Sequence, residues 1–209
     1  MLNLAGSHSW IFNLNCIFVF EFIVTMRLLF SLVFLSSLNL VAQDHQMGVK
    51  FGGLVANLSG DGTDELAAMP NFQAGFFMEI DLTKDVQVQP ELLFTVYGFR
   101  QNSGDTPNVR LNYVALPIIV KYFVSDTFSI DAGPQVGLLV TAKNGTGSMA
   151  DVKSDFHERD FGVNLGASLN ISDKVAASLR YYFGLTDVSS ADTKNFNKAL
   201  QFAFQFKIN

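Results

Sequence analysis

Few residues of this chain could carry out acid–base or metal chemistry. Its histidines are His8, His45 and His157, and its one cysteine is Cys16. A single cysteine excludes an intrachain disulfide and any cysteine-based metal site. His157 lies in DFHERD, among carboxylates, where it could act as a general base or a metal ligand. We interpret it as a solvated loop histidine, and we expect no catalytic residue, no metal site and no cofactor.

A second group of carboxylates lies in GDGTDE, residues 60–65. Oxygen ligands in a glycine-rich loop could bind Ca²⁺, but the full ligand spacing of a calcium loop is missing, so we interpret this stretch as an acidic loop. The chain contains no phosphate loop and no dinucleotide fingerprint. Its net charge of -5 and its lack of a basic patch give no reason to expect nucleic acid as a partner.

Charged residues that could act together lie on the polar side of alternating segments. These residues are Lys50, Glu79, Asp81, Glu91, Lys121, Asp131, Asp160, Arg180 and Lys207. If these side chains share an interior, each must be paired or hydrated. One hypothesis is an ion-pair and amide network that closes the interior, with Glu79, Glu91, Lys121, Asp131, Asp160 and Arg180 as its main members. The other is a charged ring that selects ions in a narrow pore.

The elements that must position these charges are strands. Behind the N-terminal region we find eight segments of period two and no long segment of period 3.6. The segments are 47–57, 71–82, 86–99, 109–123, 128–140, 160–171, 174–184 and 199–208. Most have about ten residues or more, whereas strands of soluble proteins average about 5–6 and tilted membrane-spanning strands need about 9–11. Segment length therefore favours a membrane.

The connections support the same interpretation. Three are short, at 83–85, 124–127 and 172–173, and they alternate with longer polar ones at 58–70, 100–108, 141–158 and 185–198. Transmembrane barrels combine tight periplasmic turns with long external loops in this way. The polar face of the segments is rich in amides and poor in Lys and Glu for a water-facing surface, so we assign it to the interior and the apolar face to lipid.

The sequence therefore predicts an all-β fold, an eight-stranded antiparallel up-and-down transmembrane barrel. Eight strands leave a lumen that side chains can fill, which favours the closing network over the pore. Pro90, Pro117 and Pro134 fall inside predicted strands, where each removes a ladder donor. We interpret them as bulges or as positions near strand ends.

The N-terminal region is apolar from Trp10 to Ala42 apart from Glu21 and Arg27. One interpretation is a retained membrane helix. We prefer a cleavable signal peptide at 26–43, with Arg27 as its positive region and Ala42 at its cleavage site. Residues 1–25 would then be an upstream extension that results from start-codon choice, and 44–209 would form the barrel domain.

Four stretches carry a resemblance to a known family. YVALPIIVKYF at 113–123, DAGPQVGLL at 131–139, DFGVNLGASL at 160–169 and RYYFGLTDV at 180–188 resemble the small outer-membrane beta-barrel domain family, the porin-family proteins of Gram-negative bacteria. The resemblance spans nearly all of 44–209 and implies this fold and the outer membrane, but no single activity. The family often has a glutamate where this chain has Ala115, so a pair between that acid and Lys121 would be absent.

Our leading hypothesis is a non-enzymatic outer-membrane barrel, a monomer, with a structural or surface-interaction role in its external loops and at most slight passive permeation. Its expected partners are outer-membrane lipid and the barrel assembly machinery. A narrow ion- or solute-conducting porin is one alternative. Two further alternatives are a lipid-modifying barrel enzyme and a secreted soluble barrel that binds a ligand.

Overall fold

The computed structural model describes residues 45–63, 66–101, 108–145, 150–190 and 193–208. The described part belongs to one compact unit, His45–Asn209. The predicted upstream extension at 1–25 and signal peptide at 26–43 lie outside the described residues and stay predictions. In the part of the chain that is described, no helix has the length and apolarity needed to cross a bilayer.

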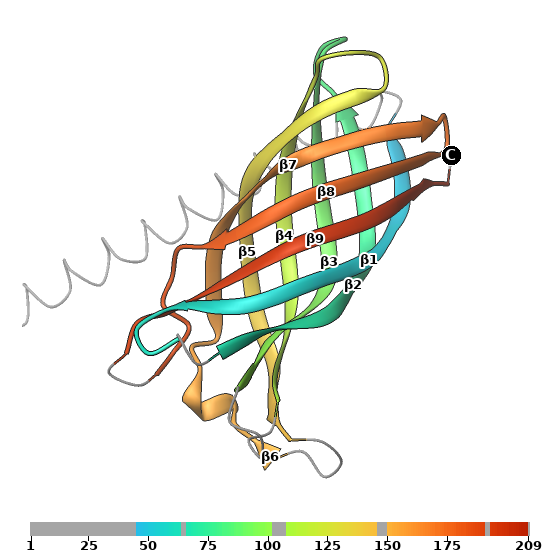
Figure 1. Cartoon of the computed structure of the whole chain (residues 1–209). Coiled ribbons are helices and arrows are strands. Elements are labelled where there is room, and N and C mark those ends of the chain that lie inside the picture. The colour runs from blue at the N-terminus through green and yellow to red at the C-terminus, as the bar shows by residue number, and fades with distance from the viewer. Residues whose placement is uncertain (1–44, 64–65, 102–107, 146–149, 191–192, 209) are drawn as a thin grey trace, which may run out of the picture. The chain divides into compact units, whose positions relative to one another are not determined.

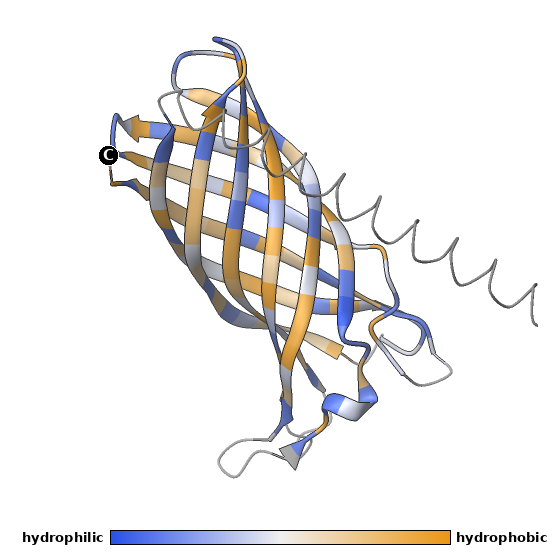
Figure 2. Cartoon of the chain, turned by 180° about the vertical axis from the view of Figure 1, so that it is seen from behind, coloured by the Kyte–Doolittle hydropathy of each residue, from blue (hydrophilic) through white to orange (hydrophobic). Residues whose placement is uncertain are grey.

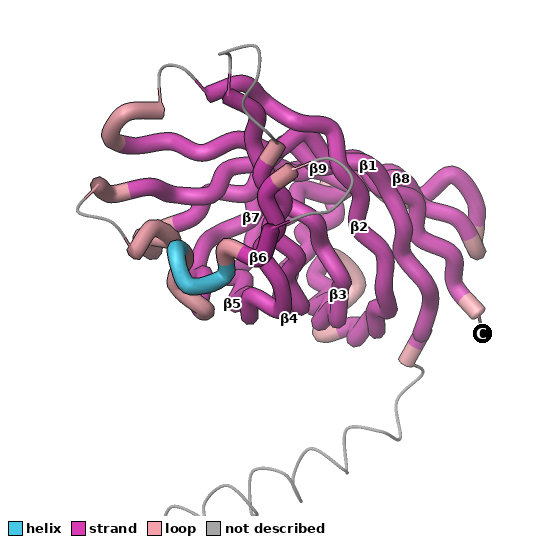
Figure 3. Tube along the Cα trace, turned by 90° about the horizontal axis from the view of Figure 1, so that it is seen from below, coloured by secondary structure: helices cyan, strands magenta, loops and turns pink. Residues whose placement is uncertain are grey.

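Eight antiparallel strands form a closed ring (Figures 1 and 3). They are β1 (Gln46–Gly60), β2 (Leu66–Asp81), β3 (Val86–Gln101), β4 (Val109–Phe123), β5 (Phe128–Asn144), β7 (Arg159–Ser172), β8 (Val175–Gly184) and β9 (Asn195–Lys207). Each strand pairs with its neighbours in sequence, and pairing of β1 with β9 closes the barrel. The predicted fold is therefore confirmed. A two-residue strand β6 (Ala150–Asp151) and a 3-10 turn η2 (Lys153–Asp155) lie between β5 and β7.

Several strands run further toward the long-loop end than the sequence predicts. The segment expected at 109–123 has those bounds as β4, but β2 begins at Leu66 and β9 begins at Asn195. Most of the predicted loop at 58–70 is therefore strand. In Figure 1, the tight turns lie at the upper end of the barrel, and β6 lies at the lower end with the longer connections. Because short turns face the periplasm in such barrels, we call the β6 end the external end.

The three prolines inside strands do not produce bulges, so the bulge interpretation was wrong. Pro90 is paired with Ile118, Pro117 with Gln135 and Pro134 with Val163, all with the register unchanged. The pairing is interrupted for two positions beside Pro90 and Pro117 and then resumes in the same register. Register shifts occur elsewhere, as between Ala68 and Gln73 in β2. A proline removes one donor, and a ladder this long tolerates the loss without adding a residue.

The two faces of the strands differ as their alternation predicts. Large apolar side chains on the outer face are exposed, among them Phe76, Ile118 and Leu165, whereas amides and charges on the inner face are buried. Figure 2 shows the alternation of apolar and polar residues along the strands. A closed ladder with an apolar exterior satisfies the backbone inside hydrocarbon, where water cannot.

We predict that Phe76→Lys blocks membrane assembly and that Leu82→Lys does not. Both side chains are exposed, at 62% and 60%, but Phe76 lies within β2 and Leu82 follows its last residue. A lysine facing lipid costs about 2–4 kcal/mol at the bilayer midplane and about 0–1 kcal/mol near the interface. The fraction of protein that resists unfolding in a cold, unboiled gel measures assembly. Equal assembly of the two variants would contradict the assigned lipid face.

Candidate functional site

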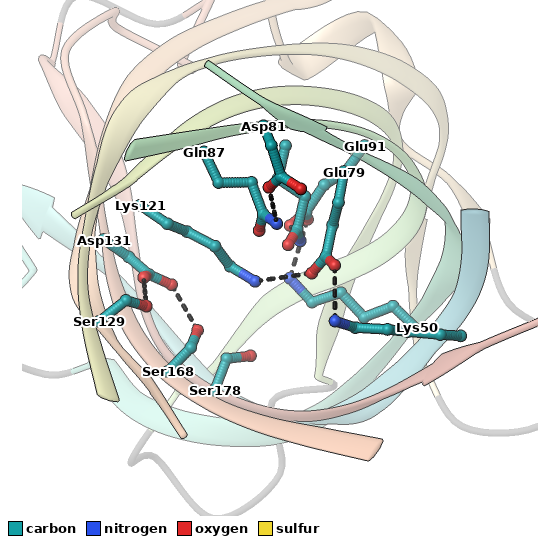
Figure 4. A network of polar contacts seen from close by, with 12 residues as sticks. Lys50, Glu79, Asp81, Gln87, Glu91, Lys121, Ser129, Asp131, Ser168 and Ser178 are labelled. Carbon is teal, nitrogen blue, oxygen red and sulfur yellow. Dashed lines mark hydrogen bonds and ion pairs between the residues drawn. The ribbon is translucent and has the colours of Figure 1, made fainter. Parts of the chain in front are cut away.

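A cluster of paired charges occupies the half of the lumen nearer the short turns. The Glu79 carboxylate on β2 is 3.0 Å from Lys121 Nζ on β4 and 2.8 Å from Lys207 Nζ on β9. Gln87 donates a hydrogen bond of 2.9 Å to Asp81 beside this pair. Figure 4 shows Glu79, Gln87 and Lys121 projecting from the barrel wall into the lumen. Lys121 therefore has a carboxylate partner, although Ala115 replaces the acid expected from the family pattern.

A second charge cluster lies further along the lumen and centres on Arg180 of β8. Its Nη1 is 2.6 Å from Glu91 of β3, and its Nε is 2.9 Å from Asp131 of β5. Glu91 also accepts a 2.8 Å hydrogen bond from Lys50. Asp131 accepts hydrogen bonds from the hydroxyls of Ser129 and Ser168. The ion-paired side chains of both clusters are at most about a tenth exposed, so these charges are almost withdrawn from water. Asp81 differs: the sequence placed it with the lumen charges, but it is the last residue of β2 and is exposed.

Gly166 makes room for the contact between Arg180 and Asp131. It pairs with Asp131 on one side and with Arg180 on the other, so it lies between them in the sheet. A Cβ atom at this position would lie 2.8 Å from Arg180 Cγ and closer still to the backbone oxygen of Leu179. Because glycine has no side chain, the arginine can cross it and reach the carboxylate on the next strand but one.

Asp160 is separate from the two charge clusters, although the sequence grouped it with them. Its carboxylate accepts hydrogen bonds from Asn197 at 2.8 Å and from Thr186 at 3.2 Å. Among the described residues it forms no ion pair. It lies beside a layer of three buried tyrosines, Tyr97, Tyr113 and Tyr182.

This aromatic layer fills the external half of the lumen. The Tyr97 ring is 5.5 Å from Tyr182, stacked upon it, and 5.6 Å from Tyr113. Apolar residues complete the cluster: Leu54, Ala56, Val109, Leu111, Leu139, Ala142 and Ala199. This layer was not predicted from the sequence, because amides and charges dominate the inner face of the strands. The clustering of tyrosines on inner positions near external strand ends was the available signal.

The external connections cover the mouth beyond this layer. We call residues 150–158 together with 185–190 and 193–194 the external cap. Val152 and Phe156 pack against the apolar cluster, so the cap shares its core with the barrel. The two parts of the cap are joined by a bridge between Phe156 and Ser189, and by hydrogen bonds from Ser190 N to Asp155 O and from His157 N to Val188 O.

The candidate ligands from the sequence lie in or near this cap. His157 is exposed, and its Nδ1 lies 3.0 Å from the backbone oxygen of Asp187. In GDGTDE, Asp61 accepts a hydrogen bond from Lys194 N, while residues 64–65 lie outside the described residues. No group of three His, Cys, Asp or Glu side chains among the described residues is placed to bind a metal ion.

Comparison with known proteins agrees with this architecture. Residues 41–190 match the family described as outer membrane protein beta-barrel domain. The chain belongs to this family. The family and the closed barrel together place the protein in the cell outer membrane, as the sequence predicted.

Solved structures share the fold of this family member at low identity. Neisserial surface protein A has a TM-score of 0.57 and 13% identity, with 79% of this chain and all of that chain covered. Ail, the attachment invasion locus protein of Yersinia pestis, has a TM-score of 0.49 and 13% identity over the same coverage. No curated protein matches the sequence. At such identities the likeness concerns the fold alone.

We predict that Arg180→Ala lowers the free energy of unfolding by about 3–5 kcal/mol, because it leaves Glu91 and Asp131 as buried charges without this partner. Lys84→Ala is the matched control. It removes a turn ion pair of 3.8 Å whose lysine is 89% exposed, and such pairs contribute about 0–1 kcal/mol. Urea unfolding of the lipid-reconstituted barrel, followed by far-UV circular dichroism, measures both. Similar losses in the two variants would contradict the role given to Arg180.

We predict that acid loosens the external cap through Asp187. Its Oδ1 accepts hydrogen bonds from Asn195 N at 2.9 Å and Ser189 N at 3.0 Å, and these N–H groups, Asn195 first, hold its pKa below the usual value. The two hydrogen bonds therefore persist at neutral pH and weaken only as pH falls through that lowered pKa. Hydrogen exchange at Asn195, corrected for its intrinsic pH dependence, should lose protection on acidification.

Because the Oδ1 of asparagine also accepts hydrogen bonds but does not titrate, the Asp187→Asn variant should show protection at Asn195 that does not change on acidification. Exchange that depends on pH equally in Asp187→Asn and in the original protein would contradict this role for the carboxylate.

Proposed function

We propose that this outer-membrane protein is a closed, non-enzymatic barrel with a structural or surface-interaction role through its external cap and at most slight passive permeation. A structural role means that the barrel holds the cap at the cell surface. The observation that carries this proposal is the contact of side chains across the whole diameter of the lumen.

Strand order identifies which contacts cross the diameter. In the ring β4-β3-β2-β1-β9-β8-β7-β5, β3 lies opposite β8 and β4 lies opposite β9. Arg180 on β8 meets Glu91 on β3 at 2.6 Å, and Tyr182 on β8 stacks on Tyr97 of β3 at 5.5 Å. Asn197 on β9 reaches the Tyr113 hydroxyl on β4 at 3.4 Å. These contacts at two levels support a lumen that is closed by its own side chains.

The external cap is the surface that such a barrel presents. His157, Glu158, Arg159, Thr186 and Asp187 line an open groove of about 560 Å³ there. The nearby Lys153–Glu158 ion pair, 3.0 Å long, is largely solvated. A polar surface fixed by backbone hydrogen bonds to a rigid barrel suits recognition of another molecule at the cell surface.

An enzymatic role has less support. His157 Nδ1 contacts a backbone carbonyl, and its imidazole is not paired with a described carboxylate and hydroxyl in the manner of a nucleophile triad. We therefore propose no reaction for the cap.

A narrow pore is the second candidate, and one observation favours it. The amides of Gln73 and Gln205 and the Nη2 of Arg180 are buried without a hydrogen-bond partner among the described residues. Buried polar groups in native proteins are usually satisfied by protein or by water. A hydrated path along these groups would give the steady ion conduction of a narrow pore.

Planar-bilayer recording of refolded residues 44–209 tests the proposal. We predict no steady discrete conductance, because the charge cluster and the tyrosine layer both cross the lumen. The triple variant Arg180→Gln, Tyr97→Ala, Tyr182→Ala should open discrete conductance. The control Tyr181→Ala, Phe183→Ala changes outward aromatics of the same strand and should stay silent. Steady conductance of the unmodified barrel would reject the closed lumen and favour the narrow pore.

A further inference from the structure

The outer wall of β4 and β5 changes from apolar to charged toward the external end. Leu116, Ile118 and Val120 are exposed apolar residues of β4, and Arg110 follows them on the outer face beyond the partly buried Asn112. On β5, exposed apolar residues continue to Val140 and are followed by Thr141 and the exposed Lys143. An apolar band that ends in charged residues marks the border between hydrocarbon and lipid headgroups.

At this border two cations face each other directly. Arg110 and Lys143 are paired residues of the β4–β5 ladder, and like charges in that position destabilise a sheet. Neither forms an ion pair with a residue that the structure describes. The nearest carboxylate in the ladder belongs to Asp151 of β6, which is paired with Lys143 of β5. The Asp151 carboxylate accepts a hydrogen bond from Lys153 N. The next outward-facing pair toward the middle of the barrel wall is Asn112 and Thr141, and these side chains are joined by a 2.6 Å hydrogen bond.

A groove of about 640 Å³ lies against this pair on the outside of the barrel. It is lined by Arg110, Lys143, Asn112 and Thr141 on one side and by Phe72 and Phe94 on the other. The two phenylalanine rings are 6.2 Å apart and exposed. The groove opens where the β2–β3 ladder is interrupted, between Ala68 and Gln73. It therefore combines two cations at the headgroup level with aromatic walls at the level of the acyl chains.

We propose that this groove binds a phosphorylated lipid of the outer leaflet. The phosphate lies between the Arg110 guanidinium and the Lys143 ammonium, relieves their repulsion and accepts charge-assisted hydrogen bonds from both. An acyl chain lies along Phe72 and Phe94. A free anion would use the cations alone, whereas only a lipid matches the combination of charge, aromatic surface and position at the edge of the apolar band.

Native mass spectrometry of the refolded full chain in detergent micelles tests the site. Dioleoyl phosphatidic acid and dioleoyl phosphatidylcholine are added at equal concentration. We expect phosphatidic acid to be retained about tenfold or more over phosphatidylcholine, the ratio that corresponds to one or two hydrogen bonds to a charged group. Arg110→Gln with Lys143→Gln should abolish the preference. Lys84→Gln, which removes an exposed cation from the turn at the opposite end, should keep it.

A second pair of variants tests whether the acyl chain contributes to binding. Phe72→Ala with Phe94→Ala should weaken retention of phosphatidic acid, whereas Phe128→Ala, an outward aromatic at the other end of the barrel, should not. If inorganic phosphate at equal concentration displaces the lipid, the groove recognises the anion alone and the lipid assignment is overturned. Equal retention of both lipids, or a preference that survives the double glutamine variant, overturns the site. If the double glutamine variant does not resist unfolding in a cold, unboiled gel, the single variant Lys143→Gln is used in its place.

Discussion

The structure depends on one constraint, that every backbone N–H and C=O inside hydrocarbon needs a partner within the protein. The β1–β9 pairing that closes the ring meets it, and the β4–β5 ladder shows how tolerant the solution is. Pro117 and Pro134 lie in that ladder or beside it, yet the register is kept on both sides of the missing donors. The ring closes with eight strands, and that number sets the width of the interior.

The interior of this width holds two distinct groups of buried side chains. Its external half is aromatic and apolar around Tyr97, Tyr113 and Tyr182, and its other half is ionic around Glu79, Glu91 and Arg180. Buried ion pairs contribute little net stability compared with an apolar core, but removal of one partner is costly. We infer that the ionic half specifies how the strands are aligned across the lumen, while the apolar half joins the barrel to the external cap through Val152 and Phe156.

Periodicity predicted the parts of the structure that depend on local pattern. The strand count, the outward face and the inward position of Glu91 or Arg180 follow from alternation, because neighbouring side chains of a strand must face opposite sides. Strand ends were less predictable from the sequence. Residues such as Leu66 and Ala67 lie beyond the lipid-facing part of the wall, where strands need not alternate apolar and polar side chains. Pairing partners across the lumen were not predictable from the sequence. The contact of Arg180 with Glu91, or of Lys121 with Glu79, depends on the stagger between strands. That stagger cannot be deduced from the alternation pattern of one sequence.

The contact between Arg180 and Glu91 also has a consequence for the order of folding. The two residues are 89 positions apart in the chain and belong to opposite strands, so they meet only when the ring has closed. Contacts of such long sequence separation form late because the chain entropy of the intervening loop must be lost first. We therefore expect the pair to form late in folding, and separating β3 from β8 across the lumen requires breaking it.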